Sequence, residues 1–129
     1  MPRVSAAFFS VGVLAVLVGM VWGMMMGATH NMITMPAHAH LNLLGWVTMG
    51  LYGTFYALEG PTLSPRLAWT NFVVSTASLV VMIPSLAMFL NAGNDPKYLP
   101  GMQAGEGLAL LGMVIFAISV VRELLRKRA

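Results

Sequence analysis

Residues 4–28 read VSAAFFSVGVLAVLVGMVWGMMMGA, a run of 25 residues without a charged side chain. A bilayer core about 30 Å thick is crossed by a helix of roughly 20 apolar residues, so this run is long enough to span a membrane. The absence of charge extends further, because no Asp, Glu, Lys or Arg occurs between Arg3 and Glu59. This stretch indicates an integral membrane protein.

The composition of the whole chain points to the same class. Of the 129 residues, 58% are hydrophobic and only 9% are charged, whereas a soluble domain carries about 25% charged residues. A soluble globular enzyme is therefore excluded. The absence of cysteine excludes disulfides, iron–sulfur clusters and thiolate metal sites. The positive charges lie at segment ends, so no nucleic-acid partner is expected.

Three further apolar runs follow, and we predict an all-α protein with one domain, residues 1–129, folded as a bundle of four transmembrane helices. Pro36 is well placed to start the second helix, and Pro84 is expected to kink the third. The first run is too long for the hydrophobic core of a signal peptide, so we expect it to be retained. The predicted spans are residues 4–28, 37–58, 67–90 and 105–121.

The basic residues predict the orientation of these spans. Arg3, Arg66 and the tail at residues 122–129 fall on one side of the membrane, and only Lys97 falls on the other. By the positive-inside rule, both termini are cytoplasmic. We therefore expect a multi-pass protein of the bacterial inner membrane, with the connector at residues 29–36 toward the outer face.

Small residues recur along the first span. Gly19, Gly23 and Gly27 are spaced by four residues, which allows another backbone or a flat ligand to approach closely. One interpretation is helix packing within the chain. The other is self-association or the wall of a cofactor site.

The histidines are the clearest candidates for function. His30 lies in the first connector, and His38 and His40 open the second span. Ionisable residues at membrane depth are costly and usually functional. In a helix, residues two apart point about 200° apart, so His38 and His40 would serve two different sites. In an extended segment they would share a face and bind one ion, but Pro36 favours the helix.

Neutral imidazole is an axial ligand of haem iron, and two histidines on opposite sides of a haem make an electron carrier. A haem also needs a flat apolar slot, for which the glycines, including Gly50, are candidates. The candidate haem-binding residues are His38, His40, Asn42, Gly45, Trp46, Gly19, Gly23 and Gly27. The candidate metal ligands are His38, His40 and His30.

The segment Ala37-His38-Ala39-His40, followed by apolar residues and a glycine, resembles the A-H-x-H signature of helix X in subunit I of haem–copper oxidases. The run from His40 to Tyr56, with Asn42 and Trp46, is also similar to helix II of the related nitric oxide reductases. The resemblance implies that His38 and His40 ligate two different haems of the b type.

The departures from that family limit the function. The oxidase subunit has twelve helices in three arcs of four, and its copper ligands lie on other helices; here no histidine follows His40. Oxygen reduction by this chain alone is not expected, and whether it is an enzyme stays open. The resemblance implies a homo-oligomer, preferably a trimer, in which His38 and His40 of neighbouring copies hold haem; a dimer is the alternative.

Two other functions remain open. Thioether and imidazole suit copper(I), so the outer end is also a candidate site for copper binding or delivery. A cofactor-free accessory subunit is the third candidate.

Glu106 is expected to be an interfacial charge, or else to relay protons or orient a histidine. For the haem protein we expect electron transfer, haem handling or redox or gas sensing, with an unidentified redox partner. The thioethers of the copper candidate come from methionines near the outer end, namely Met20, Met24, Met25, Met26, Met32, Met35 and Met49.

Overall fold

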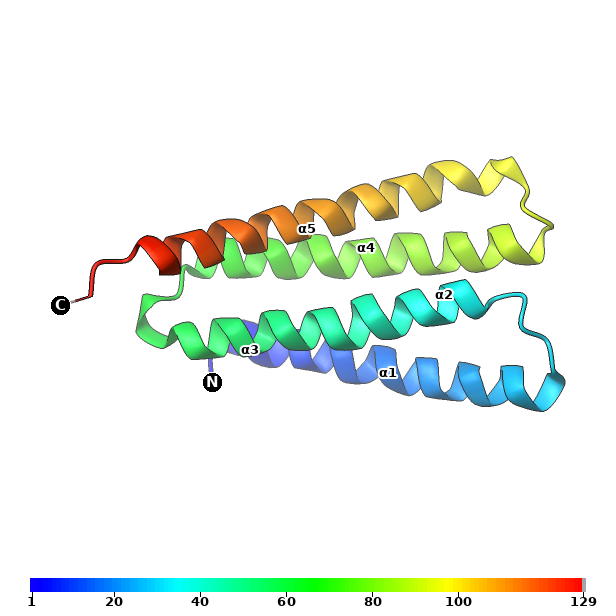
Figure 1. Ribbon diagram of the computed structural model, residues 1–129, viewed down its shortest axis with the longest axis horizontal. Coiled ribbons are helices and arrows are strands. Elements are labelled where there is room, and N and C mark those ends of the chain that lie inside the picture. Colours follow the sequence, from blue (N-terminus) through cyan, green and yellow to red (C-terminus); the bar gives the residue numbers. More distant parts are fainter. Residues whose placement is uncertain (129) are drawn as a thin grey trace.

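The computed structural model describes residues 1–128 as an all-helical bundle (Figure 1). Residues 35–59 run without a break through three consecutive segments and form one continuous helix, here called the second helix. Both termini lie at the same end of the bundle (Figure 1). The elements are α1 (Arg3–Thr29), α2 (Met35–His40), η1 (Leu41–Thr48), α3 (Met49–Glu59), η2 (Gly60–Thr62), α4 (Pro65–Asn91), η3 (Pro96–Tyr98) and α5 (Leu99–Leu125).

Three helices are long and apolar enough to cross a membrane: Arg3–Thr29, Pro65–Asn91 and Pro96–Leu125. The prediction of an all-helical chain with membrane-spanning helices is confirmed to this extent. Pro84 lies inside α4, which continues past it to Asn91.

The fourth long helix begins earlier than expected. We predicted a loop over residues 91–101 and a span from residue 105, but α5 already starts at Leu99. Gly101 and Gly105 weaken the helix signal in the sequence, because glycine is a poor helix former. In the structure these two glycines pack closely against Ser85 and Met82 of α4, and this contact outweighs the low propensity.

The second helix contains a π-helical segment, Leu41–Thr48, that the sequence did not predict. In such a segment the backbone bonds reach five residues back instead of four. Gly45 sits in this segment, and a methyl group placed there would come within 2.5 Å of Cβ of Ala15. The Thr48 hydroxyl also donates to the Leu43 carbonyl, at 2.9 Å. The segment therefore lies where the second helix meets α1 most closely.

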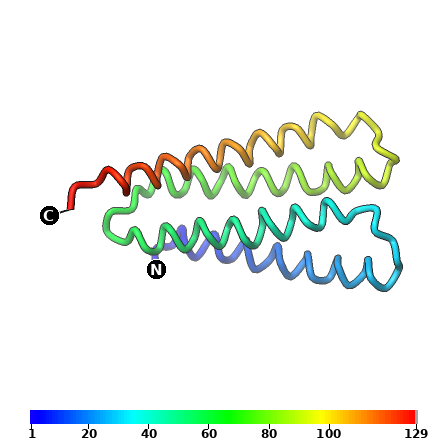
Figure 2. Tube along the Cα trace, viewed as in Figure 1, coloured from blue at the N-terminus to red at the C-terminus, as the bar shows by residue number. Residues whose placement is uncertain are grey.

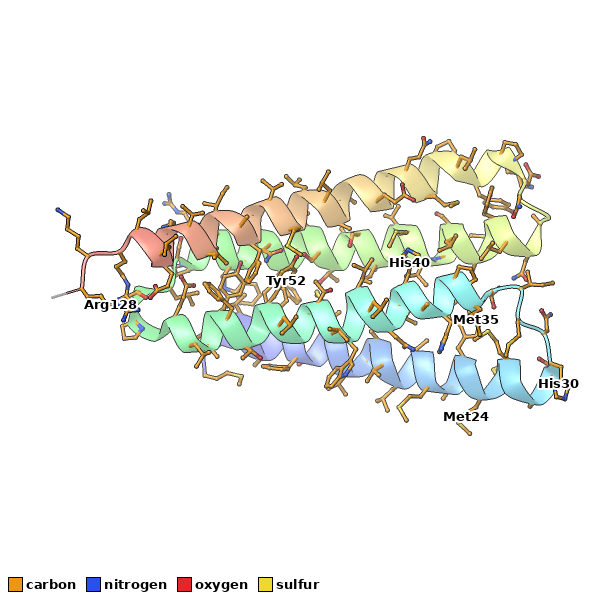
Figure 3. The ribbon with its side chains drawn as sticks, in the orientation of Figure 1. Met24, His30, Met35, His40, Tyr52 and Arg128 are labelled. Carbon is orange, nitrogen blue, oxygen red and sulfur yellow. The ribbon has the colours of Figure 1, made fainter. Side chains whose placement is uncertain are left out.

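An aromatic cluster joins all four long helices near the end that holds the termini. Phe8 of α1 lies 5.6 Å from Tyr52 of α3 and 5.3 Å from Phe72 of α4, measured between ring centroids. Tyr52 lies 4.6 Å from Phe116 of α5. Figure 3 shows side chains crowded around Tyr52 in this half of the bundle.

A chain of buried hydrogen bonds runs beside this cluster. Asn71 donates to the Tyr56 hydroxyl at 3.0 Å and accepts from Ser75 at 2.7 Å. The Tyr56 hydroxyl also lies 3.4 Å from that of Ser119. These bonds connect α3, α4 and α5, and they satisfy polar groups that an apolar surrounding would otherwise penalise.

The bundle consists of two helical hairpins, one of α1 and the second helix and one of α4 and α5 (Figure 2). Helices pack most extensively inside each hairpin, and the contacts between hairpins are sparser. The aromatic cluster contributes to the junction between the two, and α4 also contacts α2 and η1 there.

Candidate functional site

The start of the second helix places the two histidine side chains on different sides. Thr34 precedes the helix, Pro36 lies in its first turn, and the His38 amide donates to the Thr34 carbonyl at 3.1 Å. The segment is helical, as expected from Pro36. His38 is half-buried against α1, and His40 is exposed.

The His40 ring is oriented by its own helix. Nδ1 lies 2.7 Å from the carbonyl oxygen of Pro36. A carbonyl only accepts, so Nδ1 carries the proton, and in the neutral imidazole Nε2 is the nitrogen that keeps a lone pair. Metal-ligating histidines commonly donate their second N–H to a carbonyl in this way, which fixes both tautomer and ring. The His40 ring is thus held in one orientation on the exposed surface of the second helix.

His38 occupies the seam between α1 and the second helix. Its ring meets Trp22 edge to face at 6.2 Å, and Nε2 lies 3.3 Å from the Asn42 amide nitrogen. Nδ1 is buried and has no hydrogen-bond partner within residues 1–128. Buried polar atoms without partners are uncommon, so this side chain is held by an incomplete set of bonds.

Two glycines of the first helix make room for this polar pair. A methyl group at Gly19 would overlap the Asn42 side chain, and one at Gly23 would come within 3.1 Å of the His38 ring. The interpretation as packing within the chain therefore applies to Gly19 and Gly23. A haem wall at these glycines in a single chain would require Asn42 and His38 to move away. A methyl group at Gly27 would meet nothing within 4 Å.

The other residues predicted to line a haem slot are partly packed inside the bundle and partly open to the outside. Gly45 packs on Ala15 and leaves no slot. Trp46 is exposed and borders Gly12 of α1. At Gly50 an added methyl group would meet nothing within 4 Å, so this position is open toward the outside of the bundle.

The methionines do not converge with the histidines on one centre. Met26 is buried, and its sulfur accepts a hydrogen bond from Thr34 at 3.7 Å. Met49 lies in the core. Met24 is exposed, and Figure 3 shows it on the opposite side of the first hairpin from His40. A single copper site made by the whole cluster is therefore not what the structure shows.

His30 ends the first helix in a left-handed conformation, with φ of 55°, and it is exposed at the tip of the bundle (Figure 3). Glu106 is exposed on α5. Within residues 1–128, no three or more His, Cys, Asp or Glu side chains group in a way that would hold a metal ion.

The sequence reasoning missed Thr34. Its hydroxyl accepts from the Trp22 indole at 3.0 Å and donates to Met26, which ties the first connector to α1. The sequence marks Thr34 only as a helix start before Pro36, and its side chain makes no cap bond there, so no sequence signal indicated its contacts with α1.

The fold and site define a helical bundle with three helices long enough to cross a membrane and an outward-facing imidazole near one end. No protein-family profile matches the chain, and no curated protein or solved structure is detectably similar to it.

Proposed function

We propose that this chain is a haem b protein of the bacterial inner membrane that serves electron transfer, haem handling or redox or gas sensing. The observation that supports it best is the state of His40. Its Nδ1 is held by the Pro36 carbonyl, and its exposed ring leaves Nε2 for a ligand outside the bundle. Neutral imidazole with a free Nε2 is the group that haem iron binds.

The surface beside His40 fits a porphyrin. Leu43, Val47 and Leu51 follow it at helical spacing and are all exposed. Nothing surrounds Gly50 on this helix. The exposed side chains of this face are apolar, which suits the hydrophobic ring of a haem.

The second axial ligand in this proposal comes from a neighbouring copy. His38 and His40 of one chain point to different sides of the second helix and do not bind one iron together. The proposed oligomer is a homotrimer in which each haem lies between His40 of one copy and His38 of the next; a dimer is the alternative. Nδ1 of His38 has no hydrogen-bond partner within residues 1–128, and Nε2 makes one long bond to Asn42. Moving the His38 ring out of the seam would therefore break only that one hydrogen bond.

The proposed membrane placement has all four long helices crossing the bilayer and both termini in the cytoplasm. Support comes from the charge, since six of the seven basic residues lie at the end with both termini (Figure 1). Cytoplasmic ends of membrane proteins carry such an excess.

Copper(I) binding at the outer end is the second candidate. Met25 and Met26 line one cavity of about 240 Å³ together with Thr29 and Thr34. Thioethers suit copper(I), but the Met26 sulfur already accepts a hydrogen bond there. The Met26 sulfur is therefore less available to copper(I) than Nε2 of His40 is to haem iron.

The absorption spectrum of the purified protein, oxidised and reduced, tests the haem proposal. We expect the Soret band and reduced-state bands of a bis-histidine haem. His38→Ala and His40→Ala should each abolish that spectrum, because each removes one axial ligand. His30→Ala is the matched control and should leave the spectrum unchanged.

Full haem retention in both His38→Ala and His40→Ala would contradict the proposal. Colourless protein that binds copper(I) would favour the second candidate. Protein with neither haem nor copper would leave the cofactor-free accessory subunit as the function.

A further inference from the structure

The end of the bundle that holds the termini is strongly basic. Two of the four acidic residues, Glu59 and Glu123, also lie there. The positive side chains thus outnumber the negative ones at this end. The basic residues are Arg3, Arg66, Arg122, Arg126, Lys127 and Arg128.

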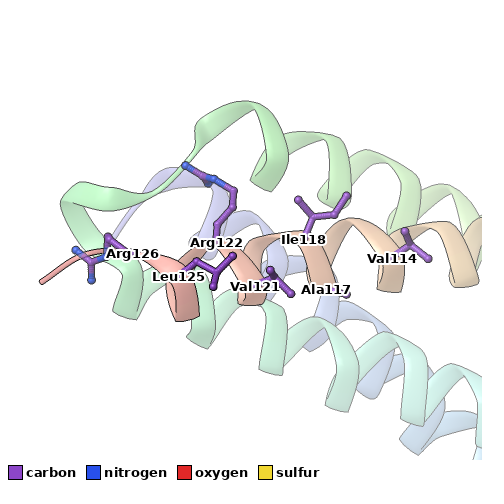
Figure 4. A pocket seen from close by; sticks show the side chains of 7 residues that line it. All are labelled: Val114, Ala117, Ile118, Val121, Arg122, Leu125 and Arg126. Carbon is purple, nitrogen blue, oxygen red and sulfur yellow. The ribbon is translucent and has the colours of Figure 1, made fainter.

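A shallow groove on α5 leads into this basic end (Figure 4). Its volume is about 590 Å³. Val114 and Val121 are each about half exposed, at 48% and 49%, and Leu125 is 73% exposed. The groove is lined by Val114, Ala117, Ile118, Val121, Arg122, Leu125 and Arg126.

The groove has two chemically distinct parts along one helix face. Its apolar residues recur at three- and four-residue spacing from Val114 to Leu125, about 17 Å at the α-helical rise. That length is close to one leaflet of a hydrocarbon core of about 30 Å. Arg122 and Arg126 stand at the terminal end of this strip (Figure 4).

The two arginines are available to an anion. Arg122 forms no ion pair within the described part of the chain, although its charge lies near the Glu59 carboxyl, and Arg126 pairs with Glu123. Guanidinium groups bind phosphate through paired hydrogen bonds. A zwitterionic headgroup would bring its own cation among these basic side chains, so charge complementarity selects an anionic headgroup.

We propose that this groove binds one anionic phospholipid, with its phosphate on Arg122 and Arg126 and one acyl chain along the strip from Val114 to Leu125. The site goes beyond the proposed haem function and does not depend on it. It depends only on α5 crossing the membrane with its C-terminal end at the lipid headgroups.

Native mass spectrometry of the full chain in detergent tests the site with two probes, dioleoyl phosphatidylglycerol and dioleoyl phosphatidylcholine. The acyl chains are identical, so any preference arises from the headgroup. We expect the first phosphatidylglycerol to bind about tenfold more tightly than phosphatidylcholine, because both lipids offer a phosphate but the choline cation is repelled by the basic side chains around it. The variant R122Q/R126Q should bind both lipids equally.

The matched control is R3Q/R66Q, which removes two charges from the same end without touching the groove. It should keep the preference, and an equal loss in this control would overturn the proposal by showing diffuse attraction. Val121→Trp fills the groove and leaves both arginines, so it should weaken phosphatidylglycerol binding even if R122Q/R126Q does not fold. Full displacement of the lipid by equimolar glycerol 3-phosphate would also overturn the proposal, because the acyl chain would then contribute nothing.

Discussion

Single hydrogen bonds inside the bundle connect different helices, and the bond from Asn71 to the Tyr56 hydroxyl is the clearest case. Both residues are buried, so loss of one partner leaves the other unsatisfied. The variants Tyr56→Phe, Asn71→Ala and their combination form a double-mutant cycle. We expect a coupling free energy of about 0.5–1.7 kcal/mol, the range of such bonds between membrane helices.

The coupling is measured from thermal unfolding of the four proteins in detergent. Ser10→Ala combined with Tyr56→Phe is the control, because Ser10 is exposed and bonds only within α1. A coupling near zero for Tyr56 and Asn71 would contradict the interhelical role of this bond.

The carboxyl of Glu59 makes the free energy of unfolding depend on pH. Glu59 ends α3, just after the predicted span. Burial raises the pKa of this carboxyl above its ordinary value, and the nearby Arg122 opposes the rise. Of the weaker influences, Glu123 raises the pKa and Arg126 lowers it. The folded state therefore holds the proton more tightly than the unfolded chain. The contribution of Glu59 to the free energy of unfolding is thus fully present below pH 4.5, the ordinary pKa, and is lost as pH rises through the raised value.

We predict that Glu59→Gln flattens this dependence. The unfolding midpoint of the unchanged protein should decrease as pH rises above 4.5, the ordinary pKa of the carboxyl, and that of the variant should decrease less. Glu106→Gln, at an exposed position of α5, should behave like the unchanged protein. Equal slopes for Glu59→Gln and the unchanged protein would refute the prediction.

The helices themselves meet along glycine seams, and Gly105 makes one of the closest approaches. A methyl group there would lie 2.7 Å from Cα and 2.8 Å from the amide nitrogen of Met82, which are backbone atoms that cannot turn aside. Two residues further along α5, a methyl group at Gly107 would meet nothing within 4 Å. The two glycines share a helix but differ in their surroundings.

We predict that Gly105→Ala lowers the free energy of unfolding by about 1–3 kcal/mol, the usual cost of overpacking. Gly107→Ala should be neutral or stabilising, because alanine is the better helix former. Thermal unfolding followed by circular dichroism distinguishes them. Similar midpoints for the two variants would argue against a tight seam between α4 and α5.

Hydropathy identified the long helices but not their details. An apolar run has no marker for the register of its hydrogen bonds, so the π-helical segment at Leu41–Thr48 was invisible. The early start of α5 was missed because Gly101 and Gly105 have low helix propensity and their partners on α4 are known only in three dimensions. Tertiary packing decided both features.

In the candidate site, too, residue spacing predicted some features and tertiary packing decided the others. Helical geometry predicted that His38 and His40 point to different sides, since the angle follows from residue spacing alone. The pairing of Gly19 with Asn42 and of Gly23 with His38 was not accessible, because it depends on how α1 lies against the second helix. The roles of these residues toward haem stay a prediction.

At the scale of the whole molecule, Phe8 is one of the side chains that make contact between the two hairpins. It is fully buried and packs on rings of Tyr52, Tyr56 and Phe72. We predict that Phe8→Ala lowers the free energy of unfolding by about 3–5 kcal/mol, the usual cost of truncating a buried phenylalanine. Leu14→Ala, on the exposed face of the same helix, should change it little.

The measurement is again thermal unfolding in detergent, with helical content at low temperature as the check that each hairpin persists. A midpoint for Phe8→Ala as high as that of Leu14→Ala would show that the aromatic cluster does not carry the junction.

The division into two hairpins also has a consequence for biosynthesis. Each hairpin already pairs its two helices along most of their length, and the turn at residues 60–64 is the only covalent link between the hairpins. We therefore expect the first pair to form before the second docks on it, through the contact of Phe8 with Phe72 and those of α2 and η1 with α4. Folding of this chain would then consist of two local pairing steps followed by one docking step.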